Sequence, residues 1–189
     1  MKRLATLVIA TLLLAGCSSV LTATRDTPME GNQGTRTLGS TLDDQLIETR
    51  AGVNIAKAHL DLESASRVSV TSYNGIVLLA GQVPRQELKD LAEQVAKNVQ
   101  RVKVVHNELT VGENLPLLAR NNDALITTNA KARMLSDSAI PGRRIKVTTE
   151  AGVVYLLGLV NRQEADLAVN AVQQIGGVQR IVKLFEYID

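Results

Sequence analysis

An internal repeat of about 70 residues constrains the fold of this chain more than any other feature. Residues 68–98 match residues 145–175 at an offset of 77, and matching continues at an offset of 79 on both sides of this stretch. The upstream matches at offset 79 are Asp44 with Asp123, Leu46 with Leu125, Ile47 with Ile126, Thr49 with Thr128, and Ala51 with Ala130. Two repeats of this length are two copies of a small domain, whereas a solenoid needs three or more stacked units. We therefore expect copy one over 41–111 and copy two over 121–189, joined by a linker over 112–120.

Both copies predict the same order of elements. A helical segment over about 41–62, and over 123–136 in copy two, precedes two strands around a tight turn. A second amphipathic helix and a last strand, over 102–111 or 179–188, close each copy. The order α-β-β-α-β predicts an α+β fold in which two helices cover one face of a three-stranded sheet.

Turn and cap residues support this order. Asn74 and Gly75 supply the positive φ angles of a two-residue hairpin turn, whereas copy two has Ala151 before Gly152, which predicts a turn of another type. Asn161, with a glutamate three residues later, predicts a capping box at the second helix of copy two. Pro84 suits the first position of the equivalent helix in copy one.

The first helix of each copy carries two apolar stripes on opposite sides. In copy two, Ile126, Ala130 and Met134 form one stripe, and the other contains Leu125, Thr128, Ala132 and Leu135. One stripe can pack on the sheet of its own domain. The spare stripe has two open interpretations: it packs one domain against the other, or it enters a membrane interface.

The N-terminus has the pattern of a secretory signal. Lys2 and Arg3 precede a 13-residue apolar run over 4–16, which is too short to span a bilayer. The run ends at Cys17, the only cysteine of the chain. An ordinary signal peptide that ends near a cysteine by chance is the alternative to a lipoprotein signal. Residues 17–40 are rich in Thr, Gly and Ser and predict a flexible tether.

The first parts of the two copies differ in net charge. Without Lys2 and Arg3 the chain has 19 basic and 19 acidic side chains, and this balance, with four aromatic residues, argues against nucleic-acid binding. Residues 120–146 contain two acidic side chains and six basic ones, whereas residues 41–67 contain three basic and five acidic ones. The six basic residues are Arg120, Lys131, Arg133, Arg143, Arg144 and Lys146. A basic face attracts anionic lipid headgroups, and a solvated face without a partner is the simpler interpretation.

No catalytic or metal-binding pattern is visible. His59 and His106 fall in different predicted elements, and no cysteine or second histidine stands at ligand spacing from either. Asp43 and Asp44 are adjacent carboxylates, but we expect them at a helix N-terminus, where the dipole favours negative charge. We expect no enzyme activity, metal or cofactor.

Two resemblances add to this interpretation. Residues 14–17, Leu-Ala-Gly-Cys, resemble a bacterial lipobox, which implies cleavage of a signal over 1–16 and lipidation of Cys17, with Ser18 favouring the outer membrane. Copy one has the pattern V-x-V-T, five residues, then V-x-L-x-G-x-V from Val68 to Val83, followed by R-Q-E at a helix start. Copy two repeats it from Ile145 to Val160, with Ile145 in place of the first valine, and this pattern resembles the BON domain. The whole arrangement is similar to the dual-BON outer-membrane lipoproteins of Gram-negative bacteria.

This resemblance implies a lipid-anchored protein that faces the periplasm and supports outer-membrane integrity, with a link to the division site. It also implies contact with anionic phospholipid of the inner leaflet through the first helix of copy two. The candidate contact residues are Leu125, Thr128, Lys131, Ala132, Arg133, Leu135, Arg143 and Arg144. That helix start has no aromatic residue, so Leu125 is the apolar candidate for a shallow insertion.

The alternative is an adaptor that binds protein partners through the spare stripes. Its partners would be outer-membrane assembly or division proteins, or a peptidoglycan-remodelling machine.

Overall fold

The computed structural model describes residues 34–188, and the predicted signal and lipidation site lie outside them. Copy one contains α3 (Leu38–Ala58), α4 (Leu60–Ser64), β1 (Arg67–Tyr73), β2 (Ile76–Val83), α5 (Gln86–Lys97) and β3 (Val104–Val111). Copy two contains α6 (Leu117–Ser136), η1 (Gly142–Arg144), β4 (Ile145–Glu150), β5 (Val153–Val160), α7 (Arg162–Gln173) and β6 (Arg180–Tyr187). The predicted α+β fold of two tandem αββαβ units is confirmed, with a short extra helix in each copy.

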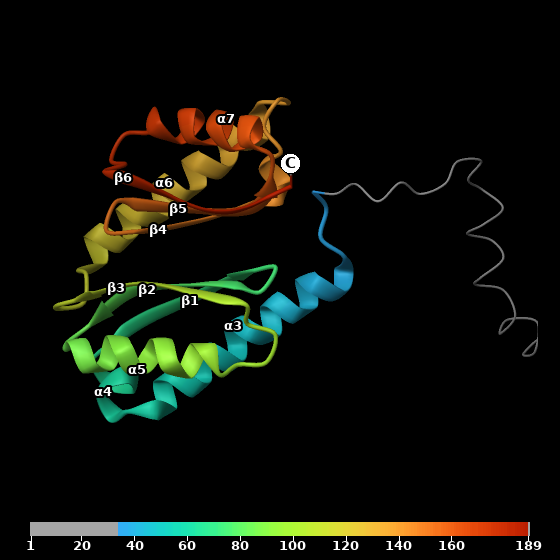
Figure 1. The fold of residues 1–189 in the computed structure, drawn as a ribbon. Coiled ribbons are helices and arrows are strands. Elements are labelled where there is room, and N and C mark those ends of the chain that lie inside the picture. The colour runs from blue at the N-terminus through green and yellow to red at the C-terminus, as the bar shows by residue number, and fades with distance from the viewer. Residues whose placement is uncertain (1–33, 189) are drawn as a thin grey trace, which may run out of the picture. The chain divides into compact units, whose positions relative to one another are not determined.

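Each copy has a three-stranded sheet with its second strand in the centre. The strand orders are β1-β2-β3 and β4-β5-β6. The central strand pairs antiparallel with the strand before it and parallel with the last one. In each copy the two long helices lie along one face of the sheet (Figure 1).

Both first helices begin earlier than predicted. α3 begins at Leu38, where the Oγ1 of Thr37 accepts the backbone N–H of Ser40 at 3.1 Å as a helix cap. α6 begins at Leu117, directly after Pro116 at its N-cap, so the helix occupies part of the expected linker over 112–120. The expected place of Asp44 at the helix N-terminus is wrong, because Asp44 is the seventh residue of α3 and its side chain is buried.

The central strands are buried on both faces. In β2, Val77 and Leu79 pack with the helices of copy one, whereas Leu78 and Ala80 point to the opposite face. This alternation follows from the two-residue period of a strand. β5 repeats the pattern, with Val154 and Leu156 on the helix side and Tyr155, Leu157 and Leu159 on the other. Each sheet therefore has a second apolar face that its own helices do not cover.

The two copies bury these faces against each other. One apolar cluster contains side chains from both sheets: Tyr73, Leu78 and Ala80 of copy one with Tyr155, Leu157, Leu159 and Leu184 of copy two. Burial raises the pKa of the Tyr155 phenol to about 12. The spare stripes of the first helices take no part in this cluster, so of their two open interpretations the packing of one domain against the other is wrong.

Polar side chains join the two copies around this cluster. Glu150 is buried and accepts hydrogen bonds from Arg67 at 2.7 Å and from the amide of Gln82 at 2.9 Å. Thr71 and Thr148, which match each other in the repeat, are in contact at 3.2 Å. Contact between equivalent positions is expected when two copies pack about an approximate two-fold axis.

The two hairpin turns have the same conformation, so the predicted difference between them is wrong. Asn74 and Gly75 have φ angles of 52° and 80°, and Ala151 and Gly152 have 52° and 74°. A buried carboxylate holds each turn. Asp44 accepts the N–H groups of Asn74 at 2.8 Å and Gly75 at 3.0 Å, and Asp123 accepts those of Ala151 at 2.9 Å and Gly152 at 2.8 Å. These charge-assisted bonds offset the strain of an alanine at positive φ.

The second helices differ in how they begin. The capping box predicted at Asn161 is confirmed, because its side chain accepts the N–H of Glu164 at 2.8 Å and Glu164 accepts that of Asn161 at 2.9 Å. The predicted place of Pro84 is wrong, since α5 begins at Gln86 with Arg85 as its N-cap residue.

The Asp44→Asn substitution tests the carboxylate that holds the first turn. Burial raises the pKa of Asp44, but hydrogen bonds from Gly75, Ser72, Asn74 and Arg36 outweigh it and hold the pKa below its ordinary value of 3.8. A carboxylate with a lowered folded-state pKa stabilises the fold above the ordinary value and loses this effect as the pH falls below it.

We expect D44N to lower the free energy of unfolding by about 2 kcal/mol at pH 7, because an amide leaves a buried donor unmatched. The difference should shrink below about pH 4, as urea unfolding at several pH values would reveal. Asp43→Asn, at a half-buried neighbour whose carboxylate pairs with Arg101 and does not hold the turn, is the matched control. An equal loss in both variants would contradict the assigned role.

The Ala151→Gly substitution tests the strain in the second turn. Glycine adopts positive φ without the Cβ clash, so we expect thermal unfolding to show a gain of about 0.5–1 kcal/mol. The same change at Ala124, an exposed helical residue, should cost about 1 kcal/mol. A loss of stability in A151G would show that the turn is not strained.

Candidate functional site

The outer face of α6 contains the predicted contact stripe. Ile126, Ala130 and Met134 are buried against the sheet, which leaves the opposite side of the helix toward solvent. Leu125, Thr128, Ala132 and Leu135 are all exposed there, and the two leucines are at least 58% exposed. The structure therefore brings the predicted apolar residues together on one accessible surface.

The stripe is longer than the sequence predicted. Leu117 and Leu118 stand in the first turn of α6 and are also largely exposed. The sequence reasoning missed them because it assigned residues 112–120 to a linker. The sequence did contain a signal for Leu117, because a helical wheel that begins at this residue places it on the same side as Leu125. From Leu117 to Leu135 the stripe is about 27 Å long at 1.5 Å per residue.

Three of the predicted basic residues flank this stripe. Lys131 and Arg133 are exposed on α6, and Arg133 donates a hydrogen bond to the side-chain oxygen of Gln174 at 2.7 Å. Arg143 is exposed in η1, and its neighbour Gly142 lies against the backbone carbonyl of Met134 near the end of α6. The only acidic residue of α6 is Asp123, whose carboxylate holds the hairpin turn. The outer face of α6 is thus apolar with a basic margin.

Two predicted basic residues do not belong to this face. The Arg144 side chain is only 19% exposed, forms an ion pair with Glu164 and donates to the carbonyl of Leu159 at 3.2 Å. Lys146 forms an ion pair with Glu48 of copy one. Both side chains serve internal contacts, so the basic surface is smaller than residue counting indicated.

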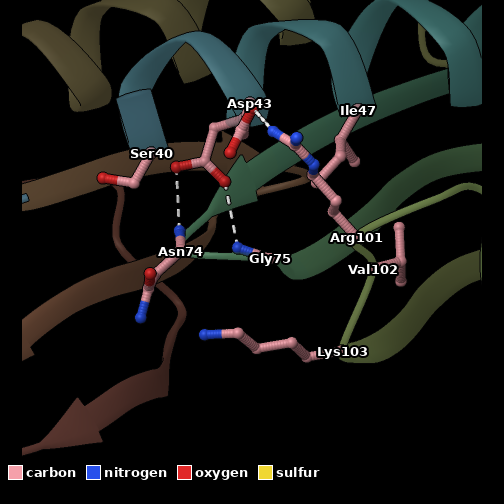
Figure 2. A pocket seen from close by; sticks show the side chains of 9 residues that line it. Ser40, Asp43, Ile47, Asn74, Gly75, Arg101, Val102 and Lys103 are labelled. Carbon is pink, nitrogen blue, oxygen red and sulfur yellow. Dashed lines mark hydrogen bonds and ion pairs between the residues drawn. The ribbon is translucent and has the colours of Figure 1, made fainter. Parts of the chain in front are cut away.

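A hollow of copy one lies elsewhere, beside the first hairpin turn. It has a volume of about 380 Å³, and Arg101 and Lys103 extend into it from the loop before β3 (Figure 2). Its carboxylates are engaged, because Asp44 holds Asn74 and Gly75 while Asp43 pairs with Arg101. This arrangement supports the turn and shows no group arranged for catalysis.

The two histidines have different environments. His59 caps α4, its Nδ1 accepting the N–H of Asp61 at 3.0 Å, and His106 is half-buried in β3. Within residues 34–188 no group of three or more His, Cys, Asp or Glu side chains is placed to hold a metal ion. In the same part of the chain, no helix is both long and apolar enough to cross a membrane.

Comparison with known proteins decides the family. The BON domain matches residues 43–113 and 122–189, which are the two structural copies. The chain belongs to the BON domain family. It is 35% identical over 189 residues to "Outer membrane lipoprotein DolP" of Haemophilus influenzae, covering all of this chain and 97% of the relative.

Two further relatives are BON-related proteins of other bacteria. The "21 kDa hemolysin" of Actinobacillus pleuropneumoniae is 32% identical over 81% of this chain and 78% of its own length. "Osmotically-inducible protein Y" of Escherichia coli K12 is 31% identical over 76% of this chain and 72% of its own length. These relatives do not come from enzyme families. The resemblance to dual-BON lipoproteins and the expected location are confirmed, and the chain is an outer membrane lipoprotein of the BON family.

Alanine substitution of the two adjacent arginines tests their separate roles. We expect Arg144→Ala to lower the free energy of unfolding by about 1 kcal/mol, because Glu164 and the Leu159 carbonyl lose a charged donor. Arg143→Ala should stay within about 0.5 kcal/mol of the wild type, as for other exposed side chains. Urea unfolding of both variants measures the difference. Equal losses would mean that the two arginines share one environment.

Proposed function

We propose that this protein binds anionic phospholipid reversibly through the α6 face while a lipidated Cys17 anchors it to the outer membrane. The α6 face comprises the apolar residues Leu117, Leu118, Leu125, Thr128, Ala132 and Leu135 with the basic residues Lys131, Arg133 and Arg143. The observation that supports this most is an exposed apolar stripe with a basic margin and no exposed carboxylate on the same helix.

The expected free-energy contributions favour a weak contact between the α6 face and the membrane. Each leucine that leaves water contributes up to about 2 kcal/mol, and each basic side chain near an anionic surface about 1 kcal/mol. Without an aromatic side chain in the stripe, the helix rests at a shallow depth. The gain is partly offset by the lost freedom of the folded part, so the contact stays reversible beside a permanent anchor.

The segment between Cys17 and α3 is long enough for the α6 face to contact the anchoring membrane. Twenty residues separate Cys17 from Leu38, and a fully extended segment of this length spans at most about 70 Å. The folded part can therefore touch the membrane that holds the acyl chains, from the periplasmic side. A weak second contact on a tethered protein responds to local lipid composition, because tethering supplies a high effective concentration.

The role is non-enzymatic and supports outer-membrane integrity, with a link to the division site that rests on family resemblance. Cells without the protein should become more sensitive to detergents and large antibiotics. A fluorescent fusion with reversed charges at Lys131 and Arg133 should lose enrichment at the septum. Uniform membrane fluorescence of the wild-type fusion would remove the division-site part of the proposal.

Liposome sedimentation tests the lipid contact directly. The mature chain with Cys17→Ser should bind vesicles of phosphatidylglycerol or cardiolipin and not vesicles of phosphatidylcholine alone. Lys131→Glu combined with Arg133→Glu should weaken binding about tenfold or more and reduce its dependence on salt. The matched control, Lys97→Glu with Lys183→Glu, makes the same charge change on α5 and β6 and should bind as the wild type does.

Some results would argue against the lipid contact. Equal binding to neutral and anionic vesicles, or binding to neither, would exclude the lipid proposal. In a separate pull-down from outer-membrane extract, capture of an envelope protein that tolerates both salt and the Lys131 and Arg133 reversals would favour the adaptor function.

A further inference from the structure

The outer face of α3 repeats the features of the α6 face, although sequence reasoning proposed lipid contact for the α6 face alone. Leu38, Leu42, Leu46 and Val53 are each at least 46% exposed and lie on one side of α3. Leu38 and Leu46 match Leu117 and Leu125 at the repeat offset of 79. Ile47, Ala51 and Ile55 occupy the opposite, buried side. We call the exposed residues, with Arg50 and Lys57, the α3 face.

The charges around the α3 face are positive. α3 contains three acidic side chains, and each has a partner: Asp43 pairs with Arg101, Asp44 holds the hairpin turn, and Glu48 pairs with Lys146. Its two basic residues, Arg50 and Lys57, are exposed and form no ion pair with any residue between 34 and 188. The negative charge that residue counting assigned to this segment is thus used internally, and the free charge on the surface is basic.

Basic and apolar groups also lie side by side here. Leu46, Arg50 and Arg101 line one small hollow next to α3, so guanidinium groups stand beside the apolar stripe. A surface of this chemistry complements a bilayer with anionic headgroups, where leucines enter the acyl boundary and cations stay at the phosphate level. The N-terminal end of the same helix is also the part of the fold nearest in sequence to the predicted anchor.

The α3 and α6 faces point away from each other. The strand alternation places the helices of copy one and copy two on the outer sides of two sheets whose inner sides share one apolar cluster. Each stripe lies on the helix side opposite the sheet that the helix covers. The two stripes therefore face solvent on different outer layers of the molecule.

We propose that the α3 face is a second anionic-lipid contact, and that the two opposed faces let one molecule hold two anionic bilayer surfaces together. The proposal rests on the lipid contact of the α6 face. Four stacked layers of helix and sheet set the separation of the two surfaces at about 40 Å.

Vesicle clustering tests this proposal with the mature Cys17→Ser chain. Anionic vesicles of phosphatidylglycerol and phosphatidylcholine should aggregate on addition of protein, as seen by light scattering, and vesicles of phosphatidylcholine alone should not. Arg50→Glu with Lys57→Glu, or Leu42→Gln with Leu46→Gln, should abolish clustering. These variants should still sediment with single vesicles, at an affinity lowered less than about threefold.

The α6 variant separates the proposal from the function on which it rests. Lys131→Glu with Arg133→Glu should also abolish clustering but retain weak binding through the α3 face. If this variant loses all binding and the α3 variants bind and cluster normally, the α3 proposal fails while the proposed function stands. If the α6 variant binds and clusters normally, the proposed function of the α6 face fails.

Two controls complete the test. The Lys97→Glu and Lys183→Glu variant should cluster vesicles as the wild type does. Sedimentation velocity without lipid should show a monomer at the concentrations used. A dimer that the Leu42→Gln and Leu46→Gln variant disrupts would overturn the proposal, because the α3 face would then bind a second copy of this chain.

Discussion

The structure depends on central strands that are apolar on both sides. Helices cover one side of each sheet, and the side with Leu78 in β2 and Leu157 in β5 stays uncovered within a single copy. A domain of about 70 residues has too little other core to tolerate such an exposed face. The two copies therefore pack sheet on sheet, and Glu150 with its partners Arg67 and Gln82 closes the rim of this contact. Because the sheets meet, both first helices remain outside.

The buried carboxylates Asp44 and Asp123 join each first helix to its hairpin turn. Each carboxylate lies in the second turn of its helix and accepts two adjacent backbone N–H groups of the hairpin. These bonds set both the rotation of the helix and the conformation of the hairpin end. With this rotation, Ile47 and Ile126 face the core and Leu46 and Leu125 face solvent. The surfaces proposed for lipid contact are thus a consequence of the same bonds that hold the turns.

Much of the fold could be predicted because its signals are local or repeated. The offset matches showed two domains, and the alternation in 68–70 and the capping box at Asn161 indicated the elements and their order. The outer stripe of α6 was also visible, since a helix has a fixed period. The turn at Ala151 was predicted wrongly because local preference considers only the residues of the turn, whereas the distant Asp123 decides its conformation.

By itself, the sequence determined the two αββαβ domains, the apolar stripes of their first helices and the anchor motif at Cys17, because periodicity and short motifs depend on neighbours along the chain. Only the tertiary structure decided which charges remain at the surface. Arg144 and Lys146 looked like members of a basic face, but their ion pairs with Glu164 and Glu48 bring together residues far apart in sequence. The same folding pairs the acidic side chains of α3 and leaves its basic ones at the surface. It also puts α3 and α6 on the outer layers, because the inner sides of the two sheets bury their apolar side chains against each other.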